Sequence, residues 1–155
     1  MVPRAFHLLT GIVLAASVIA TAAIAETKTA AAPRVEGAML TLAIVPGRPA
    51  AIHATIVGGA SPDRLIGVEG PAPARFELHA TMSDNGIVRM RRVETLAIAA
   101  SARVALKPGG MHVMVFDLPA TKPGAMVPLS FVFEKAGRVT ASAHAMTAGA
   151  GGHHH

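Results

Sequence analysis

Apolar and polar residues alternate over short stretches of this chain, and turn-forming residues separate the stretches. Segments such as RFELH and SFVFEK alternate residue by residue, which is typical of a β-strand with one buried face. Glycine and proline mark the breaks, as in PGRP, GPAP, SDNG, KPGG and TKPG. Beyond the N-terminal region no stretch keeps a helical period for more than two turns. The pattern predicts an all-β domain, an antiparallel sandwich or barrel of about eight short strands.

The N-terminal residues have a different pattern, which indicates a signal peptide over residues 1–25. Arg4 precedes the uncharged apolar run LLTGIVLAASVIATAA, and Ala23-Ile24-Ala25 forms a small-residue cleavage site. The alternative is an uncleaved membrane anchor, but the apolar run is short for a span and ends in small residues. We therefore expect a periplasmic protein with no membrane span after cleavage. The expected organisation continues with a flexible leader over 26–34, one β-domain over 35–146 and a flexible Gly/His tail over 147–155.

Composition and charge exclude several classes of function. The chain has 14 Lys and Arg against 9 Asp and Glu, with no Trp or Tyr to stack on bases, so we expect no nucleic-acid partner. The one basic cluster, Arg89, Arg91 and Arg92, is interpreted as a solvated strand face or a docking patch for an acidic partner. The absence of cysteine excludes disulfides, thiolate metal sites and a blue-copper centre. No catalytic motif appears, so we expect a non-enzyme, and we expect a monomer.

Four side chains carry the candidate chemistry. Ten residues separate His79 from Met90, twenty-one separate Met90 from His112, and Met114 follows two positions later. The stretches LHATMSDNGIVRM and KPGGMHVMVF each read as a β-hairpin. Residues two apart on a strand share a face, so His112 and Met114 point the same way.

The first predicted hairpin allows two registers. A four-residue loop over 83–86 places His79 directly opposite Met90, whereas a two-residue Asn85-Gly86 turn places Thr81 opposite Met90 and makes His79 its diagonal neighbour. In both registers His79 and Met90 share a face.

Two imidazoles and two thioethers form an S₂N₂ set suited to Cu(I), because thioether sulfur is a soft donor that needs no deprotonation. The competing interpretation is structural: methionine commonly fills gaps in cores, and a histidine beside apolar strands is usually just hydrogen-bonded. We predict the metal ligands to be His79, Met90, His112 and Met114.

Three stretches, HATMSDNGIVRM, LKPGGMHVMVFDL and VPLSFVFEKAG, resemble the PCuAC family of periplasmic copper chaperones. The resemblance extends over residues 51–140. The family signature is a His, ten residues, a Met, twenty-one residues and then His-x-Met, and all four positions match here. The resemblance implies a cupredoxin-like β-sandwich with an exposed Cu(I) site. It also implies delivery of copper to the CuA centre of cytochrome c oxidase, often with a thiol-bearing assembly factor.

Some positions depart from the family or stay open. The segment AIHATIV carries His53, interpreted as structural, where the family usually has an aromatic residue, and residues 35–50 match least. Strand parity turns the side chains of Met82 and Met111 away from the neighbouring ligand residues. Met82 lies next to a turn, so a role for it in coordination stays open.

A second copper patch is a further hypothesis. His144, Met146 and the terminal His153, His154 and His155 would favour Cu(II), because imidazole is the harder of the two ligand types. The alternatives for the terminal histidines are a tag remnant and simple solvation.

Three functions remain open from the sequence. The leading one is a Cu(I) metallochaperone. A copper buffer or detoxification protein that also uses the tail would have the same four core ligands. A metal-free structural β-sandwich is the third, and it would bind no Cu(I) in an anaerobic titration.

Overall fold

The structure is a computed structural model that describes residues 31–149, and this part of the chain folds into ten strands. It contains no helix long and apolar enough to cross a membrane. The predicted signal peptide and the terminal histidines lie outside the described residues. The strands are β1 (Arg34–Leu42), β2 (Ala50–Val57), β3 (Asp63–Glu69), β4 (Arg75–Asp84), β5 (Ile87–Arg92), β6 (Leu96–Ile98), β7 (Arg103–Leu106), β8 (Met111–Phe116), β9 (Met126–Phe133) and β10 (Gly137–Thr147).

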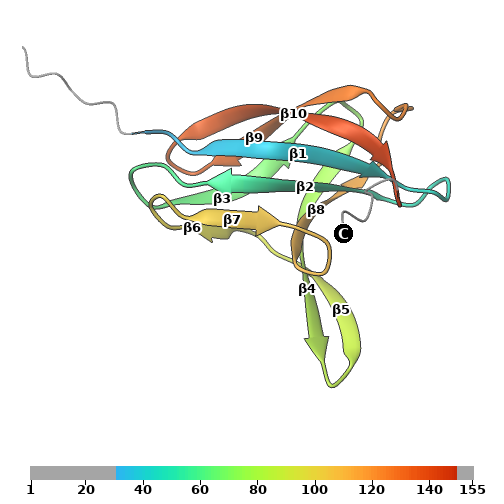
Figure 1. Cartoon of the computed structure of the whole chain (residues 1–155), viewed down its shortest axis with the longest axis horizontal. Helices are drawn as coiled ribbons and strands as arrows, with labels where there is room; N and C mark the ends of the chain where they lie inside the picture. Colours follow the sequence, from blue (N-terminus) through green and yellow to red (C-terminus); the bar gives the residue numbers. More distant parts are fainter. Residues whose placement is uncertain (1–30, 150–155) are drawn as a thin grey trace, which may run out of the picture.

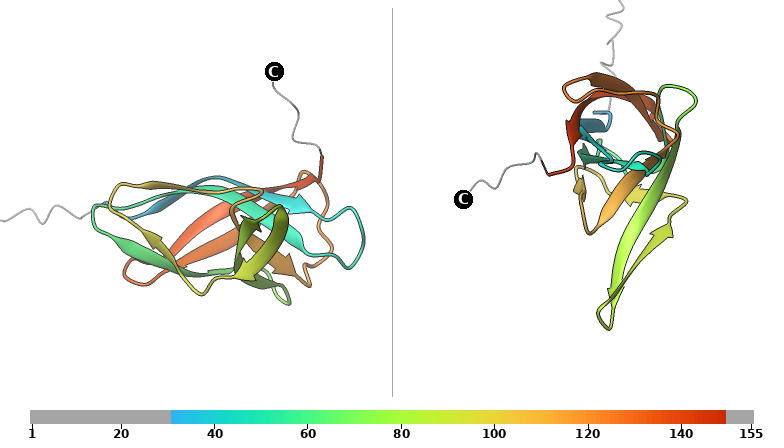
Figure 2. Two further views of the ribbon diagram at one scale, coloured as in Figure 1. Left: turned by 90° about the horizontal axis from the view of Figure 1, so that it is seen from below. Right: turned by 90° about the vertical axis from the view of Figure 1, so that its right-hand side faces the viewer.

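The strands form one curled sheet in the order β5-β4-β8-β2-β1-β10-β9-β3-β6, with β7 also paired to β2. β1 and β10 pair in parallel, and the other pairings are antiparallel. The sheet bends round so that β3 and β4 pack together, and the end-on view of Figure 2 shows the strands encircling a core. The predicted all-β, cupredoxin-like sandwich is confirmed, with ten strands where about eight were expected.

Alternating residues of the strands fill the core. On β9 the large side chains Phe131 and Phe133 are buried, while Val132 between them is not. Leu40 on β1 and Ile52 on β2 are fully buried and face the same interior. Burying each such side chain stabilises the fold by about 1.5–3 kcal/mol. The segment over residues 35–50, the least predictable part of the domain, thus contributes to the core through β1.

A buried carboxylate closes the end of this core next to the turn between β9 and β10. Asp63 accepts hydrogen bonds from the backbone N–H groups of Arg64 at 2.7 Å, Lys135 at 3.0 Å and Ala136 at 2.9 Å. Burial alone would raise the pKa of Asp63, but these donors outweigh it and hold the pKa below its ordinary value. Asp63 therefore ties β3 to the β9–β10 turn in its ionised form.

β4 and β5 form a hairpin whose tip projects from the barrel as an arm (Figure 1). Asp84 pairs with Ile87 around the two-residue turn Asn85-Gly86, whose φ angles of 49° and 80° are those of a type I′ turn. The two-residue register is therefore the one adopted, and Thr81 faces Met90. Every residue of β5 is exposed, and in the sheet this strand pairs with β4 alone among the described strands.

The second predicted hairpin is wrong, and the difference shapes the site. β7 and β8 do not pair with each other as a ladder; each pairs with a successive part of β2, and the KPGG segment loops out between them. The backbone N–H of Lys107 closes this loop by donating to the carbonyl of Met111 at 2.6 Å. β8 is thereby free on its other side to pair with β4. Local turn residues predicted a reversal, but the long ladder of β2 determined the pairing.

Candidate metal centre

Two imidazoles face each other at the centre of the candidate site. His79 on β4 and His112 on β8 are direct partners in the antiparallel ladder, and their ring centroids lie 6.2 Å apart. The alternate residues Leu78 and Val113 point into the core, so both histidines lie on the outer face of the sheet. His112 is nevertheless only 4% exposed, and the side chain of His79 is 16% exposed.

Hydrogen bonds fix which ring nitrogen of each histidine is available. Nδ1–H of His112 donates to the carbonyl of Gly110 at 3.0 Å, which leaves Nε2 with a free lone pair. Nε2–H of His79 donates to a carboxylate oxygen of Glu77 at 3.1 Å, which leaves Nδ1 as the lone-pair nitrogen. That Nδ1 atom is buried and has no hydrogen-bond partner. A buried lone pair without a partner is costly, and a bound metal ion would satisfy it.

The two predicted thioether ligands lie on the same face as the histidines. Met114 is two residues beyond His112 on β8 and pairs with Glu77 of β4, so it flanks the two rings. Met90 is on the arm, diagonal to His79 and 60% exposed. Strand pairing thus groups three of the four predicted ligands closely, and Met90 lies at the rim where the arm leaves the barrel.

The neighbouring methionines lie on the opposite face of the same strands. Met82 pairs with Arg89 rather than with a ligand position, and it is 53% exposed. Met111 pairs with Ala80 and packs against the hydrophobic core. The positions agree with the parity prediction for both residues. The described part of the chain contains no group of three or more His, Cys, Asp or Glu side chains that could hold a metal ion. A ligand set larger than the two imidazoles would therefore need the methionine sulfurs.

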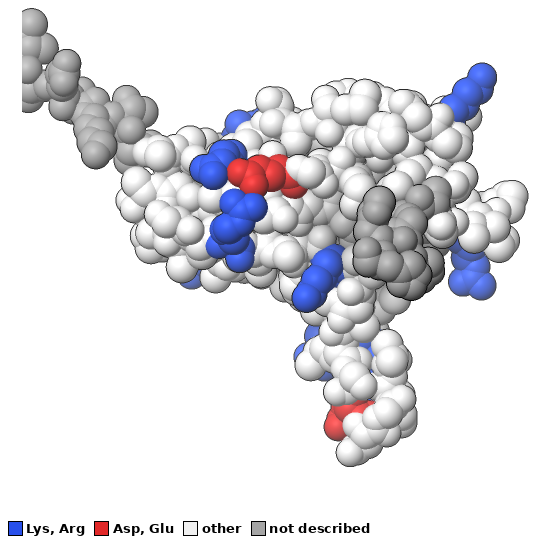
Figure 3. Space-filling view, viewed as in Figure 1, with Lys and Arg blue, Asp and Glu red and all other residues white. Residues whose placement is uncertain are grey.

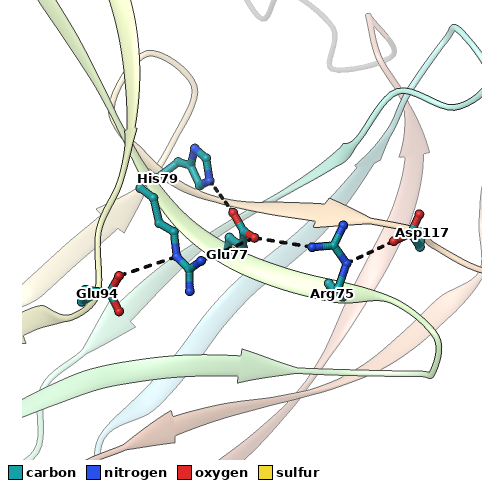
Figure 4. A network of polar contacts seen from close by, with 6 residues as sticks. Arg75, Glu77, His79, Glu94 and Asp117 are labelled. Carbon is teal, nitrogen blue, oxygen red and sulfur yellow. Dashed lines mark hydrogen bonds and ion pairs between the residues drawn. The ribbon is translucent and has the colours of Figure 1, made fainter.

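Glu77 is a residue of the candidate site that the motif did not include. Its carboxylate accepts the His79 hydrogen bond and lies 3.7 Å from Arg75 and 3.8 Å from Arg92, in a network that continues to Asp117 (Figure 4). The hydrogen bond from His79 is the main cause of a lowered pKa of Glu77; burial opposes it and the Arg92 charge supports it. An ionised carboxylate behind a ligand imidazole orients the ring and raises its basicity. Its place two residues before His79 in an alternating strand could have identified it.

An aromatic ring and a third histidine border the site. Phe116 follows Met114 on the same face, 6.5 Å from the His79 ring, with the Arg75 guanidinium 5.2 Å above it. On the other side of β8, His53 of β2 lies next to His112; burial first, and then the His112 charge, lower the pKa of His53.

The fold and the donor set together define a class: a cupredoxin-like β-domain that displays paired imidazoles beside thioethers on its outer sheet face. The family described as LpqE-like ("Putative lipoprotein LpqE-like") matches residues 16–145. The chain therefore belongs to the LpqE-like family. No curated protein matches the chain.

Solved structures with a similar fold include two PCuAC domains and one protein described in its CuI form. A copper-bound PCuAC domain from PmoF2 is 27% identical, with a TM-score of 0.62 over 76% of this chain and 95% of that one. An apo PCuAC domain from PmoF1 is 22% identical, with a TM-score of 0.62 over 76% and 96%. The solution structure of CuI-DR1885 from Deinococcus radiodurans is 24% identical, with a TM-score of 0.58 over 80% and 83%. The last two likenesses show the fold alone.

Proposed function

We propose that this protein is an exported Cu(I) metallochaperone with His79, Met90, His112 and Met114 as its metal ligands. The observation that carries the proposal is the buried, unpartnered Nδ1 of His79, which lies beside His112 and two outward-facing thioether positions. The donor set supports a soft monovalent ion, because all four donors are neutral and two of them are sulfur. The similar PCuAC domain from PmoF2, described as copper-bound, agrees with this assignment.

The arrangement suits transfer of the ion as well as its retention. Neutral donors hold Cu(I) without thiolate charge, so exchange onto the thiolates of an acceptor runs downhill. Met90 is the most exposed of the four ligands and lies on the projecting arm. An acceptor that displaced this thioether first would form a mixed intermediate while both imidazoles stayed bound. No redox step by the chaperone is needed.

The proposed setting is the periplasm, with the CuA centre of cytochrome c oxidase or a thiol-bearing assembly factor as acceptor. Arg89, Arg91 and Arg92 lie on the exposed strand of the arm, close to Met90. This basic strand is suited to dock an acidic acceptor surface next to the ion. We propose that the protein acts as a monomer and without catalysis of its own.

An anaerobic titration followed by transfer tests the function. The full chain, loaded with one equivalent of Cu(I), is mixed with an apo CuA domain, and the copper content of each is measured after separation. A chaperone loses its copper to the domain within the experiment. Retention of the copper by the loaded protein would favour a buffer instead, and failure to bind the first equivalent would reject both functions.

A further inference from the structure

A second row of nitrogen and sulfur donors crosses the sheet on the strands beside the first site. Met39 on β1 pairs with His53 on β2 and, on its other side, with His144 on β10. His144 in turn pairs with Met126 on β9. Direct ladder partners point to the same face of a sheet, so the side chains follow one another as His, Met, His and Met across four adjacent strands.

This row lies on the outer face. The residues next to Met39 and His144 in sequence, Leu40, Ala143 and Ala145, are buried in the core, and the row points the opposite way. A surface hollow of about 520 Å³ opens at the β1–β2 half of this row; Met39, His53 and Met146 line it, and His144 does not. Met146 is two positions beyond His144 on β10 and therefore shares its face.

The methionines of this row do not serve as core filler. Within residues 31–149, none of the seven methionines is fully buried. Met39 is 41% exposed and Met126 is 60% exposed. A large apolar side chain gains little stability at such positions, so packing does not explain why thioethers alternate with imidazoles along one line.

We propose that His53, Met39, His144 and Met146 form a second site for a soft monovalent cation of the Cu(I) class. His53 and His144 are each one strand, about 4.8 Å, from Met39, so both imidazoles can lean toward an ion above its sulfur. Met146 would supply a second thioether from the wall of the hollow. The site is distinct from the one built on His79 and His112.

The charges around the hollow suit neutral donors. Glu36 and Lys107 are its charged lining residues and carry opposite signs. The Glu36 carboxylate is held by Arg34 at 2.8 Å and Arg103 at 2.7 Å, so it is not free as a hard ligand. Figure 3 shows acidic and basic side chains side by side toward one end of this face, and much of the rest of the surface drawn there is uncharged. Imidazole and thioether donors in such surroundings favour Cu(I) over hard divalent cations.

The test is an anaerobic Cu(I) titration of the full chain against a competing Cu(I) chelator. In a variant without the first site, His112→Asn with Met114→Leu, one equivalent should still bind. Adding Met39→Leu and His53→Asn should weaken that remaining binding at least 100-fold. Met126→Leu is the matched control and should change it by less than twofold, because Met126 lies beyond His144, away from the hollow.

Nuclear magnetic resonance gives a second readout that does not depend on affinity. The ring signals of His53 and His144 should move when Ag(I), a non-oxidising analogue, is added to the first-site variant. If the first-site variant still binds one equivalent of Cu(I) after Met39→Leu and His53→Asn are added, the ion lies elsewhere and the proposal is overturned. The proposal is also overturned if the ring signals of His53 and His144 do not move when Ag(I) is added. These outcomes are independent of the first site, which the same variant has already disabled.

Discussion

Substitution of Glu77 tests whether the carboxylate behind His79 strengthens metal binding. With an imidazole between them, the carboxylate and an ion on Nδ1 would be about 6.5 Å apart, given a metal–nitrogen bond of about 2.0 Å. At an effective dielectric constant of about 20 the attraction is about 2.5 kcal/mol. Arg75 and Arg92, at 3.7 and 3.8 Å, offset part of this attraction. We therefore expect Glu77→Gln to cost about 1.4 kcal/mol, a tenfold loss of Cu(I) affinity.

The matched control is Glu94→Gln. Glu94 belongs to the same arginine network, 3.7 Å from Arg92, but its side chain is 84% exposed and has no contact with His79. Competition with a Cu(I) chelator measures both affinities, and thermal unfolding shows that both variants are folded. Equal losses in the two variants, or no loss in Glu77→Gln, would refute the assignment of Glu77 as the residue that supports His79.

Three further predictions concern parity, the buried carboxylate and the turn. Met90→Leu should weaken Cu(I) binding more than tenfold whereas Met82→Leu should change it less than twofold, measured by chelator competition; similar losses would contradict the face assignment. Asp63→Asn should lower the free energy of unfolding by about 1–3 kcal/mol at pH 7, measured in urea. Because folding lowers the pKa of Asp63, this contribution is present above the unfolded pKa and is lost as pH falls through the folded pKa. The difference in unfolding free energy between Asp63→Asn and the parent chain should therefore narrow as the pH falls below the ordinary value of 3.8; a constant difference would exclude a role for the charge. Gly86→Ala places a side chain at a φ of 80° and should cost about 1 kcal/mol, seen as faster amide exchange in β5; unchanged exchange would show that the turn does not hold the arm.

Local pattern was enough to predict most of the strands, and it also predicted the shared face of His79 and Met90. The alternation RFELH and the Asn85-Gly86 dipeptide predict β4, β5 and a hairpin with two possible registers, and the structure adopts the one with the two-residue turn. The pattern predicted about eight strands and ten form; one of these, β6, has three residues, which are too few for alternation to be visible.

Contacts between distant segments could not be predicted from local pattern. The KPGG turn indicated a hairpin, but β7 and β8 gain their hydrogen bonds from β2, a strand about fifty residues earlier. The direct pairing of His79 with His112 follows from that choice. The pairing of Met39 with His144 likewise joins strands from the two ends of the domain. The row of donors across the sheet therefore could not be predicted from the order of residues along the chain.

X-ray absorption at the copper edge, on the full chain loaded with one equivalent of Cu(I), tests the central claim most directly. In a chain whose second site is removed by Met39→Leu with Met146→Leu, we expect two nitrogen and two sulfur neighbours, and we expect both sulfurs to be lost when Met90→Leu and Met114→Leu are added. A sulfur count unchanged by that double substitution, or a shell of nitrogen and oxygen alone in the parent chain, would contradict it.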